Sequence, residues 1–204
     1  MLDFKLMLIT DATSTQRPLL EALEDAMKAG VKAIQLREKA MSARELMSLA
    51  VELRQMTRRY GALLFINDRV DVALAVEADG VQLGGLSIPV DAARRLAGDK
   101  LLIGKSTHSL DEAFEARRKG ADYVILGPVY ATPSKAKYGQ PIGPELILSV
   151  RHRVKLPVFA VGGIKPHNVK EVMDNGADGI AVISGILSCD NIADVTKQYM
   201  ESLR

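Results

Sequence analysis

The chain has 204 residues, and its 27 basic and 25 acidic side chains leave a formal net charge of +2 at pH 7. This balance excludes the strongly basic surface of a nucleic-acid-binding protein, and no apolar run approaches the roughly 18 residues of a membrane-spanning helix. The single cysteine, Cys189, excludes an intrachain disulfide and fits a reducing cytosol.

Short apolar runs alternate with amphipathic segments along the whole chain. The apolar runs predict eight β-strands, within residues 6–10, 29–38, 63–67, 77–85, 101–106, 119–128, 157–163 and 175–185. Apolar residues at helical spacing predict eight α-helices, over residues 17–29, 43–60, 69–78, 89–98, 110–120, 144–154, 165–176 and 191–203. Four of these helices have a proline in the favourable first turn: Pro18, Pro89, Pro144 and Pro166.

The elements follow the order strand then helix throughout the chain. The strands are continuous apolar runs, which indicates a parallel sheet buried on both faces. Such units predict a single small (β/α)8 TIM barrel over residues 1–204, with an open doubly wound sheet as the alternative. The first segment, MLDFKLMLIT, lacks the basic flank and cleavage site of a signal peptide. We therefore expect a cytoplasmic protein.

Polar residues or glycines follow the predicted strands. A TIM barrel builds its active site at the C-terminal ends of its strands, so these residues are expected to gather at one rim. They are Thr10, Asp11, Gln35, Arg37, Glu38, Lys39, Asn67, Asp68, Gln82, Gly84, Gly85, Lys105, Ser106, Thr107, His108, Gly162, Gly163, Ser184 and Gly185. A purely structural barrel would not require so many polar groups there, so this rim is the expected site of function.

Two glycine-containing segments, 161–164 and 182–186, suit a phosphate group. They follow the last two predicted strands, where TIM barrels usually bind phosphate. Glycines let the backbone approach a ligand closely, and the start of the following helix offers free N–H groups. The alternative is that Gly162 and Gly163 only permit a tight turn.

The segment 127–143 suits a diphosphate. It is longer than most loops between a strand and a helix. Its hydroxyl and ammonium groups would meet basic groups across the rim, and the set is Thr132, Ser134 and Lys135 with Arg37 and Lys39. The alternative is a solvated loop that happens to carry lysines.

Asp68 and His108 are candidates for chemistry at the rim. Asp68 offers the hard oxygen ligand that Mg²⁺ prefers, or it caps the helix that follows it. His108 could be a general acid or base, a role in which histidine is the commonest side chain, or it could bond a backbone group at a helix end. The residues alone leave both pairs of alternatives open.

Eight stretches of the chain match the patterns of one family. They are LMLITD, IQLREK, FINDRVDVAL, ADGVQLG, GKSTHSLDEA, GADYVILGPVYATPSK, PVFAVGGI and ADGIAVISGI. Over nearly its whole length the chain resembles the thiamine phosphate synthase/TenI family. The resemblance implies a small TIM barrel that works on thiazole phosphate in thiamine biosynthesis.

The synthases of this family join hydroxymethylpyrimidine diphosphate to thiazole phosphate, giving thiamine phosphate and diphosphate, with Mg²⁺ as cofactor. The resemblance implies that the diphosphate is held by Arg37, Lys39, Asn67, Thr132, Ser134 and Lys135. It implies that Asp68 holds Mg²⁺, that Gln35 lies beside the pyrimidine and that Ser106 lies near the reacting carbons. Gly163, Ile183 and Ser184 would bind the thiazole phosphate. The expected partners are thus small molecules, and the oligomeric state stays open.

One stretch departs from the synthase pattern. Synthases usually read HLGQ-x-D after the fourth strand and use that Asp as a second Mg²⁺ ligand, whereas this chain reads QLGGLS and has Ser87 there. TenI-type relatives also lack the Asp; they are metal-independent thiazole tautomerases, in which the residue matching His108 is the proposed proton shuttle. Against a tautomerase, the chain keeps Asp68 and the T-x-S-K loop. The alternatives to a synthase are therefore a tautomerase or a non-catalytic regulatory relative.

Overall fold

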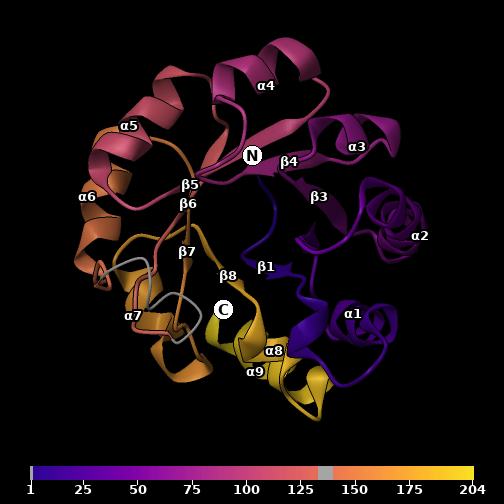
Figure 1. The fold of residues 1–204 in the computed structure, drawn as a ribbon. Coiled ribbons are helices and arrows are strands. Elements are labelled where there is room, and N and C mark those ends of the chain that lie inside the picture. The colour runs from indigo at the N-terminus through magenta and orange to yellow at the C-terminus, as the bar shows by residue number, and fades with distance from the viewer. Residues whose placement is uncertain (1, 133–139) are drawn as a thin grey trace.

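The computed structural model describes residues 2–132 and 140–204. Within these residues the strands pair in parallel in chain order and close into a barrel, with β8 beside β1 (Figure 1). The strands are β1 Leu6–Ile9, β2 Ala33–Leu36, β3 Leu63–Asn67, β4 Gly80–Leu83, β5 Leu102–Thr107, β6 Tyr123–Leu126, β7 Val158–Val161 and β8 Gly179–Val182. The predicted TIM barrel is confirmed, and the open sheet is excluded.

Figure 1 shows the helices as an outer ring around the strands. They are α1 Leu19–Lys28, α2 Ala43–Tyr60, α3 Val70–Ala75, α4 Val90–Ala97, α5 Leu110–Arg118, α6 Glu145–Val154, α7 Val169–Asp174, α8 Ser184–Leu187 and α9 Ile192–Ser202. The 3-10 turns Ala12–Ser14 and Pro166–Asn168 precede α1 and α7. In the described part of the chain, no helix has the length and apolar character needed to cross a membrane.

The helices differ from the sequence prediction in two respects. The short helix α8 was not predicted, because its residues continue the apolar run of β8 and carry no separate helical pattern. Pro18, Pro89 and Pro144 stand at the residue before their helices rather than inside the first turn. There the fixed φ of proline still suits the entry of the chain into a helix.

Alternate strand residues pack in two separate places. One set packs with the helices in the large outer core, and the other fills the inside of the barrel. The inner set includes the aromatic rings of Phe65, Tyr123 and Phe159, and Phe4, which precedes β1, packs with them. Gly80, which pairs in register with Phe65, leaves room for these rings, because a Cβ at this glycine would lie 2.6 Å from the Phe65 ring. Large rings opposite a glycine thus close the interior.

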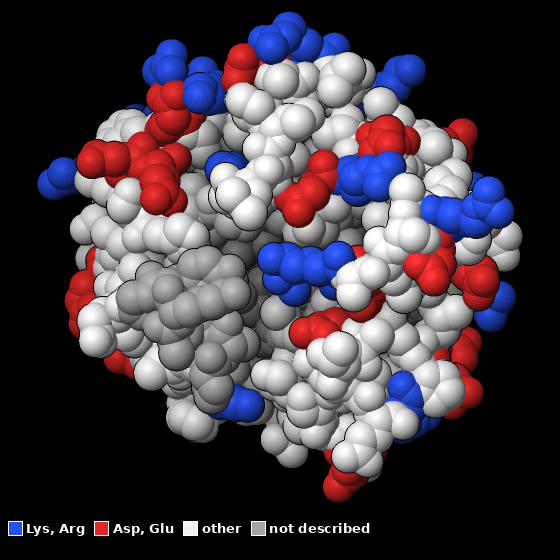
Figure 2. Space-filling model, viewed as in Figure 1, with Lys and Arg blue, Asp and Glu red and all other residues white. Residues whose placement is uncertain are grey.

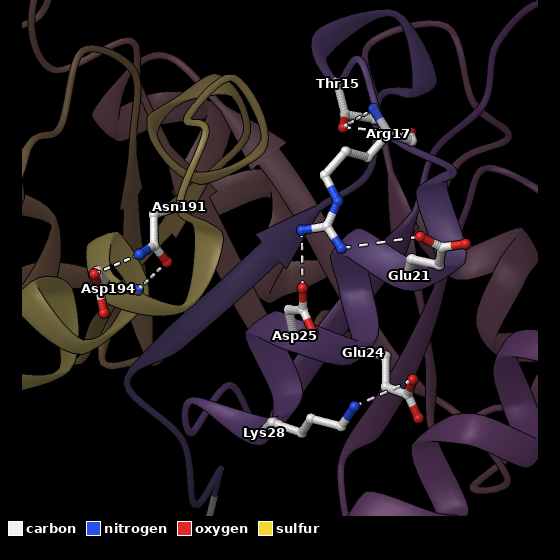
Figure 3. A network of polar contacts seen from close by, with 8 residues as sticks. All are labelled: Thr15, Arg17, Glu21, Glu24, Asp25, Lys28, Asn191 and Asp194. Carbon is white, nitrogen blue, oxygen red and sulfur yellow. Dashed lines mark hydrogen bonds and ion pairs between the residues drawn. The ribbon is translucent and has the colours of Figure 1, made fainter.

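On the outer surface near α1 and α9, polar contacts link residues that are close together in the sequence. Figure 3 shows Arg17 before α1 paired with Asp25 on that helix, with 2.8 Å between Nη1 and Oδ2. It also shows Asn191 capping α9, where its Oδ1 accepts from the backbone N–H of Asp194 at 3.1 Å. Exposed ion pairs of this kind contribute little to stability, so the barrel rests on its two cores.

Candidate active site

The ends of the strands border a hollowed face of the molecule. Figure 2 shows this hollow near the middle of the barrel, with basic and acidic side chains at its border. A cavity of about 570 Å³ extends from the loops after β4 and β5 along α5. Ser87, Lys105, Ser106 and His108 line its end at the strands, and Glu112 and Glu115 line it on the helix. The predicted rim therefore offers space for a small molecule beside polar groups.

Asp68 turns its carboxylate toward the loop after β4. Its Oδ1 accepts hydrogen bonds from the Gly84 backbone N–H at 3.1 Å and from the Ser87 hydroxyl, and its Oδ2 accepts from Asn67 Nδ2 at 2.7 Å. The capping alternative is wrong, because α3 begins after Arg69 and the Asp68 carboxylate bonds the β4 loop instead. The carboxylate is thus held at the rim.

Gln35 extends this hydrogen-bonded line to β2. Its Nε2 donates to Asn67 Oδ1 at 3.0 Å, so three neighbouring strands contribute linked groups to the rim. Gln35 is only 2% exposed, and within the described residues its Oε1 is buried without a hydrogen-bond partner. A buried acceptor that the protein leaves unpaired fits a ligand with an N–H or O–H donor.

Ser106 is linked to Gln82 on the neighbouring strand. Gln82 Nε2 donates to Ser106 Oγ at 3.0 Å, so the serine oxygen is the acceptor in this contact. The proton of the Ser106 hydroxyl is then left to be donated elsewhere. Because Ser106 lines the cavity, a bound substrate is one possible acceptor.

Lys105 holds the β4 loop in place from β5. Its Nζ donates to the Gly84 carbonyl, while the Gly84 N–H donates to Asp68. Burial lowers the pKa of Lys105, and the charges of Glu112 and Asp68 act in the opposite direction. Lys105 therefore supports the peptide that positions the Asp68 carboxylate.

His108 reaches across to the end of β6. Its ring Nδ1 contacts the Gly127 carbonyl, while Ser109 rather than His108 caps α5 with its side chain. The carbonyl is an acceptor, which assigns the ring proton to Nδ1 and leaves Nε2 as the basic nitrogen. The ring contact is therefore at the end of β6 and not at the helix end named as the alternative. A role for His108 as general acid or base stays a prediction.

Arg37 and Lys39 leave the barrel at the end of β2 on either side of Glu38. The Glu38 carboxylate is turned toward β1, where it accepts from Thr10 Oγ1 at 2.6 Å and from the Ala12 N–H at 3.1 Å. Thr10 Oγ1 in turn accepts from the Arg37 backbone N–H at 2.9 Å. These bonds connect the residues after β1 to the loop after β2, which carries both basic residues.

The long segment after β6 is described only in part. Thr132 is half-buried at the start of this segment. Ser134 and Lys135 lie outside the described residues, so their predicted place beside the diphosphate stays a prediction.

The loops after β7 and β8, which the sequence predicts to bind a phosphate, lie against each other. Gly163 has φ +67°, and a Cβ at this residue would lie 2.7 Å from the Tyr130 Cβ. Tyr199 on α9 ties the two loops together, because its hydroxyl donates to the Ile164 carbonyl at 2.9 Å and lies against Gly185. Gly163 thus serves a tight turn, and that turn faces the loop that contains Ile183 and Ser184.

The side chains near Asp68 offer Mg²⁺ oxygen ligands but few carboxylates. Asp68 offers one carboxylate and Ser87 a hydroxyl beside it. Among residues 2–132 and 140–204, no group of three acidic, histidine or cysteine side chains gathers. Mg²⁺ commonly binds proteins through one or two carboxylates and takes its other ligands from water and substrate phosphates, so Asp68 suits an ion that arrives with a diphosphate.

Comparison with known proteins covers almost the entire chain. Residues 6–186 match the family model described as thiamine monophosphate synthase. The chain belongs to the thiamine monophosphate synthase family. It is 48% identical over 187 residues to a putative thiamine-phosphate synthase of Geobacter sulfurreducens, covering 91% of this chain and 88% of the relative. It is 46% identical over 197 residues to the thiamine-phosphate synthase of Chloroflexus aurantiacus, covering 96% and 91%.

A solved structure agrees with this membership of the thiamine monophosphate synthase family. The thiamine phosphate pyrophosphorylase from Pyrococcus furiosus superposes with a TM-score of 0.90 at 42% identity, covering 98% of this chain and 95% of that one. The resemblance inferred from the eight sequence stretches is therefore confirmed.

Some contacts near the rim of this protein were not predicted from the sequence. Tyr123 was read only as part of an apolar strand, and the support that Lys105 gives to Gly84 was not foreseen. Gln82 itself was expected at the rim, because it is the polar residue inside the apolar run GVQL. Its bond to Ser106 follows only from the strand register, which no sequence pattern gives.

Proposed function

We propose that this protein is a thiamine phosphate synthase, a transferase that joins hydroxymethylpyrimidine diphosphate to thiazole phosphate. The observation that carries the proposal is the Asp68 carboxylate, which three donors hold at the rim and which does not serve α3. Relatives named thiamine-phosphate synthase, at 42% and 46% identity over most of their length, support it, as does the putative synthase at 48% identity.

The reaction breaks the bond between the pyrimidine methylene carbon and the diphosphate oxygen. Diphosphate leaves with the bonding electrons, and the thiazole nitrogen gives its lone pair to the resulting carbocation. Such a step needs the charge of the leaving group to be neutralised as it develops. Arg37 and Lys39 would supply that charge from the end of β2, with Thr132, Ser134 and Lys135 supplying further donors from the segment after β6.

Mg²⁺ would be held through Asp68 and would neutralise part of the diphosphate charge when bound. Around it, Asn67 fixes the carboxylate by donating to Oδ2, and Gln35 fixes Asn67. The unpaired Oε1 of Gln35 would accept from the amino group of the pyrimidine. Gln35 would thus orient the pyrimidine at the rim, while Asn67 and the basic residues hold its diphosphate.

The thiazole phosphate would lie on the opposite side of the barrel. The backbone of Gly163, Ile183 and Ser184 would bind its phosphate, because the loops after β7 and β8 meet there. Ser106, near the cavity at the end of β5, would then face the reacting atoms between the two substrates.

Ser87 tests the proposed Mg²⁺ site. Ser87→Asp places a second carboxylate beside Asp68, and two like charges repel when no cation is present. We therefore expect this variant to have a lower Tm than wild type in chelator and a larger rise in Tm on adding Mg²⁺. Ser87→Asn, which is neutral and similar in shape, is the control and should show no larger rise than wild type. If the Tm of Ser87→Asp does not change when Mg²⁺ is added, there is no cation site at Asp68.

A thiazole tautomerase is the second candidate, because Ser87 replaces a carboxylate and His108 lines the cavity. If His108 moves the proton in isomerisation, His108→Ala should lose on the order of 100-fold or more of that activity. If the protein is a synthase, the same variant should still form thiamine phosphate at close to the wild-type rate. Both activities are measured on wild type and variant in parallel, and the synthase proposal fails if only isomerisation is found.

A further inference from the structure

The Tyr123 hydroxyl is a buried polar group to which the site described above assigns no role. Tyr123 is fully buried at the start of β6, with its ring edge-on to Phe65 and Phe159 at centroid distances of 5.7 and 5.8 Å. Within residues 2–132 and 140–204 its hydroxyl has no hydrogen-bond partner. The other deeply buried tyrosine, Tyr199, donates to a carbonyl. A buried hydroxyl without a hydrogen-bond acceptor destabilises the folded protein. We therefore looked for an acceptor near the Tyr123 hydroxyl.

The Oε1 of Gln82 is the acceptor that faces the same space. It too is buried, and in the described chain it lacks a partner. A Cβ placed on Gly104, the glycine between them on β5, would lie 2.2 Å from Gln82 Oε1 and 2.5 Å from the Tyr123 hydroxyl oxygen. Both oxygens therefore lie close to the same position above Gly104. At this separation the Tyr123 hydroxyl can donate to Gln82 Oε1 directly or through a single water.

A bond from Tyr123 would set the orientation of the Gln82 amide. With its oxygen accepting from the phenol, the amide presents its Nε2 to Ser106, as observed at 3.0 Å. In the flipped orientation the amide oxygen would instead take the Ser106 proton, and the Tyr123 proton would stay buried without an acceptor. Burial raises the pKa of Tyr123, so the phenol keeps the proton that it must donate.

We propose that Tyr123 and Gln82 are positioning residues that hold the Ser106 hydroxyl with its proton directed to an acceptor atom of the substrate. The line Tyr123–Gln82–Ser106 crosses three adjacent strands, β6, β4 and β5, and ends at the cavity. The proposal rests on the synthase function for its substrate, but the hydrogen-bond line itself does not depend on that function.

Tyr123→Phe removes the donor at the start of this line and keeps the ring. We expect kcat for thiamine phosphate formation to fall about tenfold with KM for both substrates nearly unchanged, because the substrates still bind while Ser106 is misdirected. In a Ser106→Ala background the same change should have no further effect, since coupled residues are not additive. Full additivity of the two substitutions would overturn the proposal.

The control variant is Phe159→Leu in the same aromatic cluster. It disturbs the packing around Tyr123 without touching the hydrogen-bond line, so it should lower Tm while kcat per folded molecule stays at the wild-type value. A fall in kcat equal to that of Tyr123→Phe would mean that packing, and not the hydroxyl, matters. That result would also overturn the proposal.

A neutron crystal structure of the unliganded wild-type protein, which distinguishes the amide oxygen from the amide nitrogen and shows the protons, separates this proposal from the synthase function. A Tyr123 oxygen bonded to Gln82 Oε1, directly or through one water, supports the line even if wild type makes no thiamine phosphate. A Gln82 oxygen bonded to Ser106 instead refutes it even if wild type is an active synthase.

Discussion

Asp68→Asn is expected to lower the turnover of thiamine phosphate synthesis by at least about tenfold, because it removes the charge matched to the metal and diphosphate. Asparagine is a better replacement than alanine for this test, because it fits the backbone conformation at this residue. Asp68 has φ +63°, a conformation that asparagine tolerates well and alanine does not. The variant therefore changes charge without adding backbone strain. Turnover is measured at saturating substrates and several Mg²⁺ concentrations, and high Mg²⁺ should not restore the wild-type rate.

Asp71→Asn is the matched control. Asp71 lies three residues further along the chain, but it is exposed and pairs with Arg69 rather than with the β4 loop. Its loss should leave turnover and the Mg²⁺ dependence unchanged. If Asp68→Asn turned over at the wild-type rate, Asp68 could not be the residue that holds the metal.

Gly163→Ala is expected to raise KM for thiazole phosphate by about tenfold or more, because it loses backbone contacts to the phosphate group. Gly163 has φ +67°, and the added Cβ would lie 2.7 Å from the Tyr130 Cβ and 2.9 Å from the Ala131 carbonyl oxygen. The loop after β7 must move to relieve these contacts, and it would then no longer match the loop after β8. KM for the pyrimidine diphosphate should change little.

Gly61→Ala controls for backbone strain alone. Gly61 ends α2 with φ +58°, and no atom lies within 4 Å of a Cβ at this residue among the described neighbours. Its replacement should destabilise the protein by about 1 to 2 kcal/mol through the left-handed conformation, with KM unchanged. If both variants shifted KM equally, the effect at Gly163 would reflect general instability and the phosphate assignment would fail.

The sequence predicts the barrel well because its strands are buried on both faces and its helices on one. Each element then carries its own pattern, and the helix over 43–60 is found with the predicted ends. The prediction failed where two elements share one apolar run. That is the case at Ser184, where α8 begins two residues after β8.

The site is predicted less completely, since contacts across strands depend on register. The sequence identified Asp68 as a candidate, but a cap and a rim ligand need the same residue type in the same place. Only the contact with Gly84 decides between them. Tyr123 could not be distinguished from an ordinary core aromatic, because what marks it is the small space above Gly104 that it shares with Gln82.

The most direct test of the central claim is one incubation of the purified protein with hydroxymethylpyrimidine diphosphate, thiazole phosphate and Mg²⁺, read by mass spectrometry. We expect thiamine phosphate and diphosphate to form together, and both to disappear when a chelator removes the metal. A folded protein that binds thiazole phosphate but forms no thiamine phosphate would contradict the assignment as a synthase.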